Sequence, residues 1–203
     1  MTTNGVGFYY DLASPYAYLA STRVDDMLGP DVHWKPILVG AVHKHYRRVS
    51  WGATPELRAA GIAEIERRAA DYGLPPIVWP EPYPANSLLA MRAALWAHQR
   101  ARGREFAQTA FAMAFREGID LTQRAAVAQA AERAGLDPED LARALDTPRL
   151  KSDLRKRTEK AIASGVYGVP TFDAGGFLWW GDHLLPAARA AEEWRRRQAH
   201  ESA

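Results

Sequence analysis

The sequence contains no cysteine among its 203 residues. This absence excludes a disulfide framework, a cysteine-ligated metal site and dithiol redox chemistry by the chain alone, so any thiol chemistry needs a sulfur atom from another molecule. The sequence also lacks an apolar run long enough to span a membrane, and its first ten residues lack the basic start and apolar stretch of a signal peptide. We therefore expect a cytoplasmic protein with no membrane association.

A charge excess is also absent, because 26 Lys and Arg residues are nearly balanced by 24 Asp and Glu residues. The resulting net charge of +2 offers no long-range attraction for nucleic acid, so no nucleic-acid partner is expected. Short basic clusters at 47–48, 155–157 and 195–197 lie on or beside predicted helices, where we expect solvated surfaces. His43 and His45 have no acidic neighbour or third ligand, so no metal site is predicted.

Hydrophobic residues make up 47% of the chain and seven residues are tryptophan, which indicates a packed globular protein. Apolar periodicity and turn residues predict short strands and longer helices. The predicted strands begin at Phe8 and cover 32–39, 169–172 and 177–180, and the predicted loops cover 40–51 and 77–85. The predicted helices cover 15–28, 55–72, 105–116, 122–134, 138–145, 148–164 and 184–197, with one more between Leu88 and Gly103.

The order of these elements predicts the fold class. A strand, a helix and a second strand within about forty residues indicate a right-handed crossover and a parallel strand pair. Residues 46–148 contain helical signals only, and two strands and a helix follow them. The sequence therefore predicts an α/β fold split between residues 1–45 and 149–203 and interrupted by an all-helical insertion at 46–148.

Ser14 and Pro15 stand where the first strand turns into the first helix. Serine is a favoured N-cap and proline a favoured first helical residue, so Ser14 is placed beside backbone N–H groups that have no partner within the helix. Such a position favours an anion, and it is also where thiol-redox proteins place a cysteine of low pKa. Ser14 lacks the Gly-x-Ser-x-Gly setting of an acylating serine, so it is not predicted to act as a nucleophile itself. A role as an N-cap alone stays open.

Two motifs at opposite ends of the chain carry a resemblance. Ser14-Pro15-Tyr16-Ala17 stands where thioredoxin-like oxidoreductases have Cys-x-x-Cys, and Gly168-Val169-Pro170-Thr171-Phe172 resembles the cis-proline loop that faces that motif. With the helical insertion, the chain resembles the DsbA-like branch of the thioredoxin superfamily. Within this branch it is similar to 2-hydroxychromene-2-carboxylate isomerases and kappa-class glutathione transferases.

Three further segments support the resemblance. Residues 40–44, Gly-Ala-Val-His-Lys, resemble the lysine-bearing loop after the second strand, and residues 84–87 resemble a Pro-x-Asn segment. Residues 177–184, FLWWGDHL, resemble a Phe-Trp-Gly-x-Asp-Arg-Leu stretch, although this chain is one residue shorter there and has His183 in place of arginine.

The resemblance implies a glutathione-dependent isomerase of an aromatic 2-oxo acid, active in aromatic catabolism and homodimeric, that works by reversible addition of the thiol. Ser14 would donate a hydrogen bond to the sulfur of glutathione or of another small thiol. The implied thiol-binding residues are Ser14, Val169, Pro170, Gly181, Asp182 and His183. The implied substrate-binding residues are Lys44, Trp51 and Asn86, with Trp79 and Tyr83 as further aromatic wall.

Simpler explanations stay open for several of these residues. Asp182 and Asn86 are also suited to capping a turn or a helix, and Lys44 to an exposed loop. Aromatic residues such as Trp51 are commonly core residues. Two other functions also stay open: a transferase with peroxidase-like activity toward electrophiles, and a cysteine-free DsbA-like scaffold that binds a peptide along Val169 without catalysis.

Overall fold

The computed structural model describes residues 5–201 and is built around a four-stranded sheet of order β2-β1-β3-β4. The strands are β1 Gly7–Tyr10, β2 His33–Pro36, β3 Thr171–Ala174 and β4 Phe177–Trp180. β1 is parallel to β2 and antiparallel to β3, and β3 forms an antiparallel hairpin with β4. The predicted parallel pair and C-terminal hairpin are confirmed.

Helices account for most of the remaining described chain. The α-helices are α1 Pro15–Ser21, α2 Val24–Leu28, α3 Val39–His45, α4 Pro55–Asp71, α5 Leu88–His98, α6 Gly103–Arg116, α7 Arg124–Arg133, α8 Pro138–Leu145, α9 Pro148–Ala163 and α10 Leu185–Glu201. Two short 3-10 helices are η1 Trp51–Ala53 and η2 Asp182–Leu184. Among residues 5–201, none of these helices combines the length and the apolar character needed to cross a bilayer.

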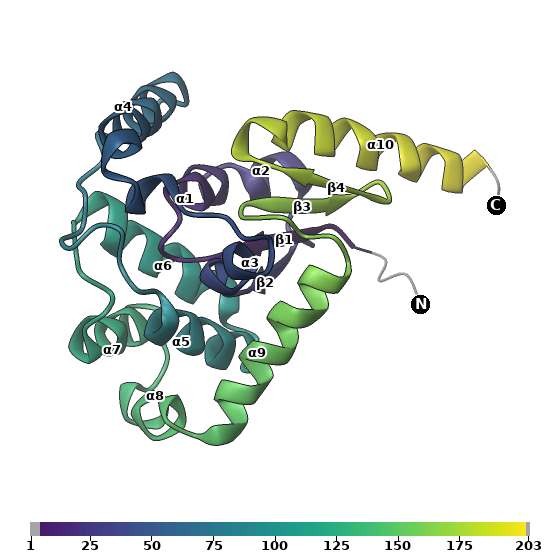
Figure 1. The fold of residues 1–203 in the computed structure, drawn as a ribbon. Coiled ribbons are helices and arrows are strands. Elements are labelled where there is room, and N and C mark those ends of the chain that lie inside the picture. Colours follow the sequence, from purple (N-terminus) through teal and green to yellow (C-terminus); the bar gives the residue numbers. More distant parts are fainter. Residues whose placement is uncertain (1–4, 202–203) are drawn as a thin grey trace.

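Both faces of the sheet are covered by packed side chains, and β1 contributes to both because its residues point alternately to the two faces. Phe8 and Tyr10 enter the larger core, where Phe8 stacks on Phe172 at 5.7 Å between ring centroids. Tyr9 lies on the other face and packs against a smaller cluster, to which α3, α9 and the loop before β3 contribute buried residues. In Figure 1, α2 and α10 lie above β3 and β4, α1 lies to their left, and α9 runs below the sheet.

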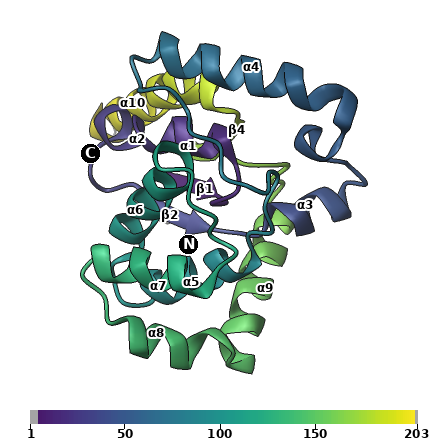
Figure 2. The same ribbon diagram turned by 90° about the vertical axis from the view of Figure 1, so that its left-hand side faces the viewer.

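The helices between α3 and α9 share the larger core with the sheet. Buried residues of α5, α6, α7 and α8 belong to the same hydrophobic cluster as Phe8 and Tyr10. Figure 2 shows α4 across one end of the molecule and α5, α7 and α8 gathered at the opposite end, with the strands between them. The helical segment therefore packs against the sheet as part of one continuous core.

Three local predictions were wrong. The predicted helix 15–28 is divided at Thr22, whose hydroxyl donates back to the Leu19 carbonyl at 2.9 Å. The predicted strand 32–39 ends at Pro36, and the predicted loop 40–51 begins with a helix, α3. The start of α3 is stabilised from a distance, because Leu38 N–H donates to Thr158 Oγ1 at 3.1 Å and Val39 N–H to the Asp11 carboxylate at 2.9 Å.

Candidate functional site

Ser14 occupies the N-cap of α1, as predicted. Its backbone is extended, with φ −93° and ψ 113°, and its Oγ accepts the Ala17 N–H at 3.2 Å. Pro15 follows as the first helical residue, where its missing N–H is not needed. The Ser14 O–H makes no hydrogen bond to another residue within 5–201, so this donor stays available to a ligand.

The loop before β3 lies on the other side of the site. The Val169–Pro170 peptide bond is cis, as predicted. Pro170 C=O accepts the Gly181 N–H at 2.9 Å, which fastens the loop to the end of β4. Within the described part of the chain, neither the N–H nor the C=O of Val169 makes a hydrogen bond. Val169 therefore presents one free donor and one free acceptor.

A pocket of about 520 Å³ lies between these two elements, since Ser14 and Val169 both line it. Trp51 and Asn86 line it as well, and Tyr16, Tyr83 and Trp180 add aromatic wall. Its other lining residues are Ala13, Pro15, Leu38, Val39, Gly40, Ala41, His43, Arg48, Val49, Ser50, Pro84, Ala85, Ser87 and Leu88. No carboxylate is among these lining residues. The pocket wall is therefore partly aromatic, and it carries no negatively charged side chain.

The other predicted site residues do not line this pocket. Lys44 is exposed on α3, and His183 is exposed on η2. Pro170 and Gly181 are not among the lining residues, and the Gly181 N–H donates to the Pro170 C=O. Trp79 packs behind the pocket wall, with its ring 4.7 Å from the ring of Tyr83.

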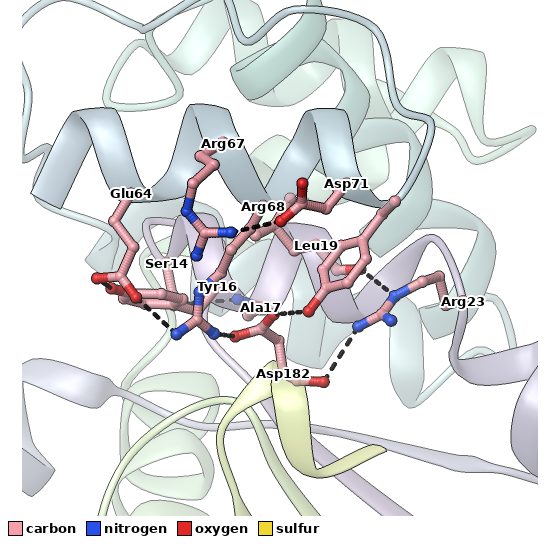
Figure 3. A network of polar contacts seen from close by, with 11 residues as sticks. Ser14, Tyr16, Ala17, Leu19, Arg23, Glu64, Arg67, Arg68, Asp71 and Asp182 are labelled. Atoms are coloured by element: carbon pink, nitrogen blue, oxygen red, sulfur yellow. Dashed lines mark hydrogen bonds and ion pairs between the residues drawn. The ribbon is translucent and has the colours of Figure 1, made fainter. Parts of the chain in front are cut away.

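Asp182 is placed in a buried ion-pair network instead of the pocket (Figure 3). Its side chain is 1% exposed, and one oxygen accepts from Arg68 Nη1 at 2.6 Å while the other accepts from the Tyr72 hydroxyl at 2.8 Å. Its backbone C=O accepts from Arg23 Nη2 at 3.0 Å. Each carboxylate oxygen therefore already accepts one side-chain hydrogen bond, and the predicted contact of this carboxylate with a bound thiol stays a prediction.

The same network extends to the pocket wall through Tyr16. Arg68 Nη2 binds Glu64 at 2.6 Å, and Glu64 accepts the Tyr16 hydroxyl at 3.1 Å (Figure 3). Burial, with Glu64 nearby, raises the pKa of Tyr16 to about 12, so its hydroxyl stays protonated near neutral pH. The network thus joins α1, α4 and η2 and fixes one wall of the pocket.

Asp11 was not predicted as a site residue, but its hydrogen bonds connect three segments of the pocket wall. Its fully buried carboxylate accepts the Ala13 N–H at 2.9 Å, the Val39 N–H at 2.9 Å and the Ser87 hydroxyl at 3.0 Å. All three donors belong to residues that line the pocket. Burial raises the pKa of Asp11, and the three hydrogen bonds oppose that rise. The sequence signal that could have identified Asp11 as a site residue is its position one residue after β1.

Arg48 was also missed, because it was assigned to a solvated basic cluster. Its guanidinium lies 4.2 Å from the ring centroid of Tyr167 and 4.7 Å from that of Trp180, and Nη1 donates to the Tyr167 C=O at 2.8 Å. Arg48 is half-buried and lines the pocket, whereas its neighbour Arg47 is exposed. Sequence proximity gave no signal, since Tyr167 lies 119 residues further along the chain.

The arrangement of fold and site defines a class of protein. A parallel βαβ unit continued by an antiparallel hairpin, with a cis-proline loop facing the start of the first helix across a pocket, is a thioredoxin-like architecture. A family model described as the DSBA-like thioredoxin domain matches residues 5–191. The chain belongs to this DsbA-like thioredoxin family.

Individual relatives extend the comparison. The 2-hydroxychromene-2-carboxylate isomerase of Sphingobium xenophagum is 26% identical over 189 residues, covering 90% of this chain and 95% of that protein. The enzyme of the same name from Pseudomonas putida is 26% identical over 189 residues, covering 89% and 90%. A solved 2-hydroxychromene-2-carboxylate isomerase structure matches with a TM-score of 0.86 at 25% identity, covering 98% of each chain. A probable DsbA oxidoreductase from Streptomyces coelicolor shares the fold, with a TM-score of 0.68 at 19% identity over 92% of this chain and 88% of that one.

Proposed function

We propose that this protein isomerises an aromatic 2-oxo acid, in the manner of a 2-hydroxychromene-2-carboxylate isomerase, with the help of glutathione or another small thiol. The observation that carries the proposal is the open pocket bounded by the Ser14 hydroxyl and the unpaired backbone of Val169. Relatives with this name that match nearly the whole chain support the choice of reaction. The absence of cysteine requires the sulfur to come from outside.

The described residues fit such a thiol. Val169 offers one N–H and one C=O, which are the groups that an extended peptide uses when it adds to a strand edge. The Ser14 O–H is free to donate to a sulfur atom, and the pocket wall brings no negative charge near it. When bound, the thiolate supplies reversible addition to the unsaturated acid, which allows rotation about the former double bond.

Ser14 would act by favouring the thiolate. A hydrogen bond to a charged group is worth about 1.5–3 kcal/mol, and one pKa unit corresponds to about 1.4 kcal/mol. The hydroxyl would therefore lower the pKa of the bound thiol by about one to two units from its free value of about 8.5. We assign this effect mainly to the hydroxyl, because α1 is only seven residues long.

Absorbance of the chromene carboxylate, followed with and without glutathione, tests the proposal. We expect turnover only with a thiol, and we expect Ser14→Ala to raise the pKa of the bound thiol by about one to two units and to lower kcat/KM at neutral pH by about tenfold or more. Ser152→Ala, on α9 and away from the pocket, is the matched control. Turnover that is unaffected by removing every thiol would refute the mechanism.

Two other outcomes would assign a different function. Thiol binding with no isomerase activity, but with conjugation of electrophiles or reduction of peroxides, would favour a kappa-class-like transferase. Binding of peptides without turnover of any of these substrates would favour a non-catalytic scaffold. The homodimer implied by the family resemblance stays a prediction, which sedimentation of the purified protein tests.

A further inference from the structure

Gly61 stands inside α4, where its own backbone gives no reason for a glycine. The residue has ordinary helical geometry, without the positive φ that favours glycine. Glycine in a helix interior is destabilising relative to alanine, and the two residues before Gly61 in α4 are both alanine. Because Gly61 is also buried, what packs against it explains the missing side chain.

The Trp51 ring fills the space that a side chain on Gly61 would need. A Cβ atom at position 61 would lie 2.5 Å from Cζ3 and 2.7 Å from Cδ2 of Trp51. Carbon atoms in contact are normally about 3.5–4.0 Å apart, so even a methyl group does not fit while the ring stays in place. The indole ring of Trp51 is therefore seated directly against α4.

The backbone around Trp51 is fastened at the start of α4. Its C=O accepts the N–H of Thr54, the N-cap residue of α4, at 3.0 Å. One residue further on, the Gly52 C=O accepts from Nε of Arg58, which belongs to α4, at 2.7 Å. A group added at position 61 would therefore displace the ring of Trp51 while these bonds hold its backbone.

A displaced ring would enter the pocket. Trp51 is half-buried and lines the pocket together with Tyr16 and Tyr83, whose ring centroids lie 6.3 Å and 5.8 Å from its own. Because α4 blocks the side of Gly61, a ring pushed off its seat moves toward these two neighbours. The seat on Gly61 thus sets how much room the pocket has beside its aromatic wall.

We propose that Gly61 is a specificity-determining residue, which seats the Trp51 ring against α4 and so keeps the pocket wide enough for an aromatic acid with two fused rings. This inference rests on the proposed function, because it takes an aromatic acid as the ligand. A larger residue at position 61 narrows the pocket beside Trp51 and leaves Ser14 and Val169 in place. The site is then restricted to acids with one ring.

Isothermal titration calorimetry with two unreactive aromatic acids tests the proposal. The ligands are 2-naphthoate, with two fused rings, and benzoate, with one, each titrated in the presence of glutathione into wild type, Gly61→Ala and Ala60→Gly. We expect wild type to bind 2-naphthoate at least about tenfold more tightly than benzoate, because the second ring buries further apolar surface. Gly61→Ala should reduce this preference to about twofold or less and keep the wild-type affinity for glutathione. Ala60→Gly, at an exposed position of the same helix, should keep the preference.

Thermal unfolding gives a second measurement that needs no ligand. Alanine is a better helix former than glycine, so Gly61→Ala would raise Tm by about 2–4 °C if nothing packed against position 61. We expect no rise in the wild-type background, but a rise of that size when Gly61→Ala is added to Trp51→Ala, which removes the ring. Ala60→Gly should lower Tm by about 2–4 °C and measures the helix contribution alone.

The outcomes separate this inference from the function on which it rests. Equal affinity of wild type for the two acids would overturn the role of Gly61 and leave the thiol mechanism standing. A preference for 2-naphthoate that Gly61→Ala retains, or a Tm that Gly61→Ala raises in the wild-type background, would also overturn it. Chromene carboxylate turnover that needs no thiol, together with a 2-naphthoate preference that Gly61→Ala abolishes, would refute the proposed mechanism and leave the role of Gly61 standing.

Discussion

Replacing Asp11 with asparagine tests whether one buried carboxylate organises the pocket. In the wild type this side chain is fully buried and accepts hydrogen bonds from Ala13, Val39 and Ser87, which stand in three different segments of the pocket wall. Asparagine has nearly the same shape but only one acceptor oxygen, and its NH₂ group faces at least one of the former donors.

The expected loss follows from these bonds. A buried donor left without an acceptor costs about 1–3 kcal/mol, so Asp11→Asn should lower the free energy of unfolding by about that amount at neutral pH. Burial raises the pKa of Asp11, so the native state holds this proton more tightly than the unfolded chain does. The wild type is therefore relatively most stable below the unfolded pKa of about 3.9, and this advantage is lost as the pH rises through the raised native value.

Urea unfolding followed by circular dichroism at several pH values measures both effects. Asp26→Asn is the matched control, because Asp26 is exposed on α2 and its change should stay within about 0.5 kcal/mol. The difference between wild type and Asp11→Asn should be larger near pH 4 than near pH 7. If Asp11→Asn unfolds like Asp26→Asn at every pH, the carboxylate does not stabilise the pocket walls and the reasoning is wrong.

Two further variants test the ion pairs of Asp182 and Glu192. Asp182→Asn should lower the free energy of unfolding, measured by thermal denaturation, by about 2–4 kcal/mol, because it removes the buried partner of Arg68 and Tyr72. Unchanged stability combined with weaker thiol binding would contradict this structural role and would indicate that Asp182 binds the thiol. Glu192→Gln should cost about 1 kcal/mol, since Arg195 lowers the pKa of Glu192 to about 2 from about 4.3 in the unfolded chain, and solvent screens the exposed arginines. This stabilisation should be present above about pH 4.3 and lost toward pH 2, and a pH-independent difference in urea unfolding would contradict it.

Local sequence signals determined most of the helices and strands and two parts of the site, the N-cap at Ser14 and the cis-proline loop at Val169. Ser14 and Pro15 start α1 whatever lies around them, and Pro55, Pro138 and Pro148 each begin a helix as predicted. These signals are readable because capping and fixed φ depend on neighbouring residues only. The absence of cysteine likewise determined that reactive sulfur must come from outside.

Tertiary structure decided the rest, because the deciding partners are distant in sequence. The segment after β2 is helical since acceptors for its first N–H groups come from Asp11 and Thr158, 28 and 120 residues away. Asp182 is buried in an ion pair with Arg68, and Arg48 is held in the pocket wall by its contacts with Tyr167 and Trp180. A charged side chain is costly to bury without partners, so its role is set by what folding brings beside it, which no local pattern contains.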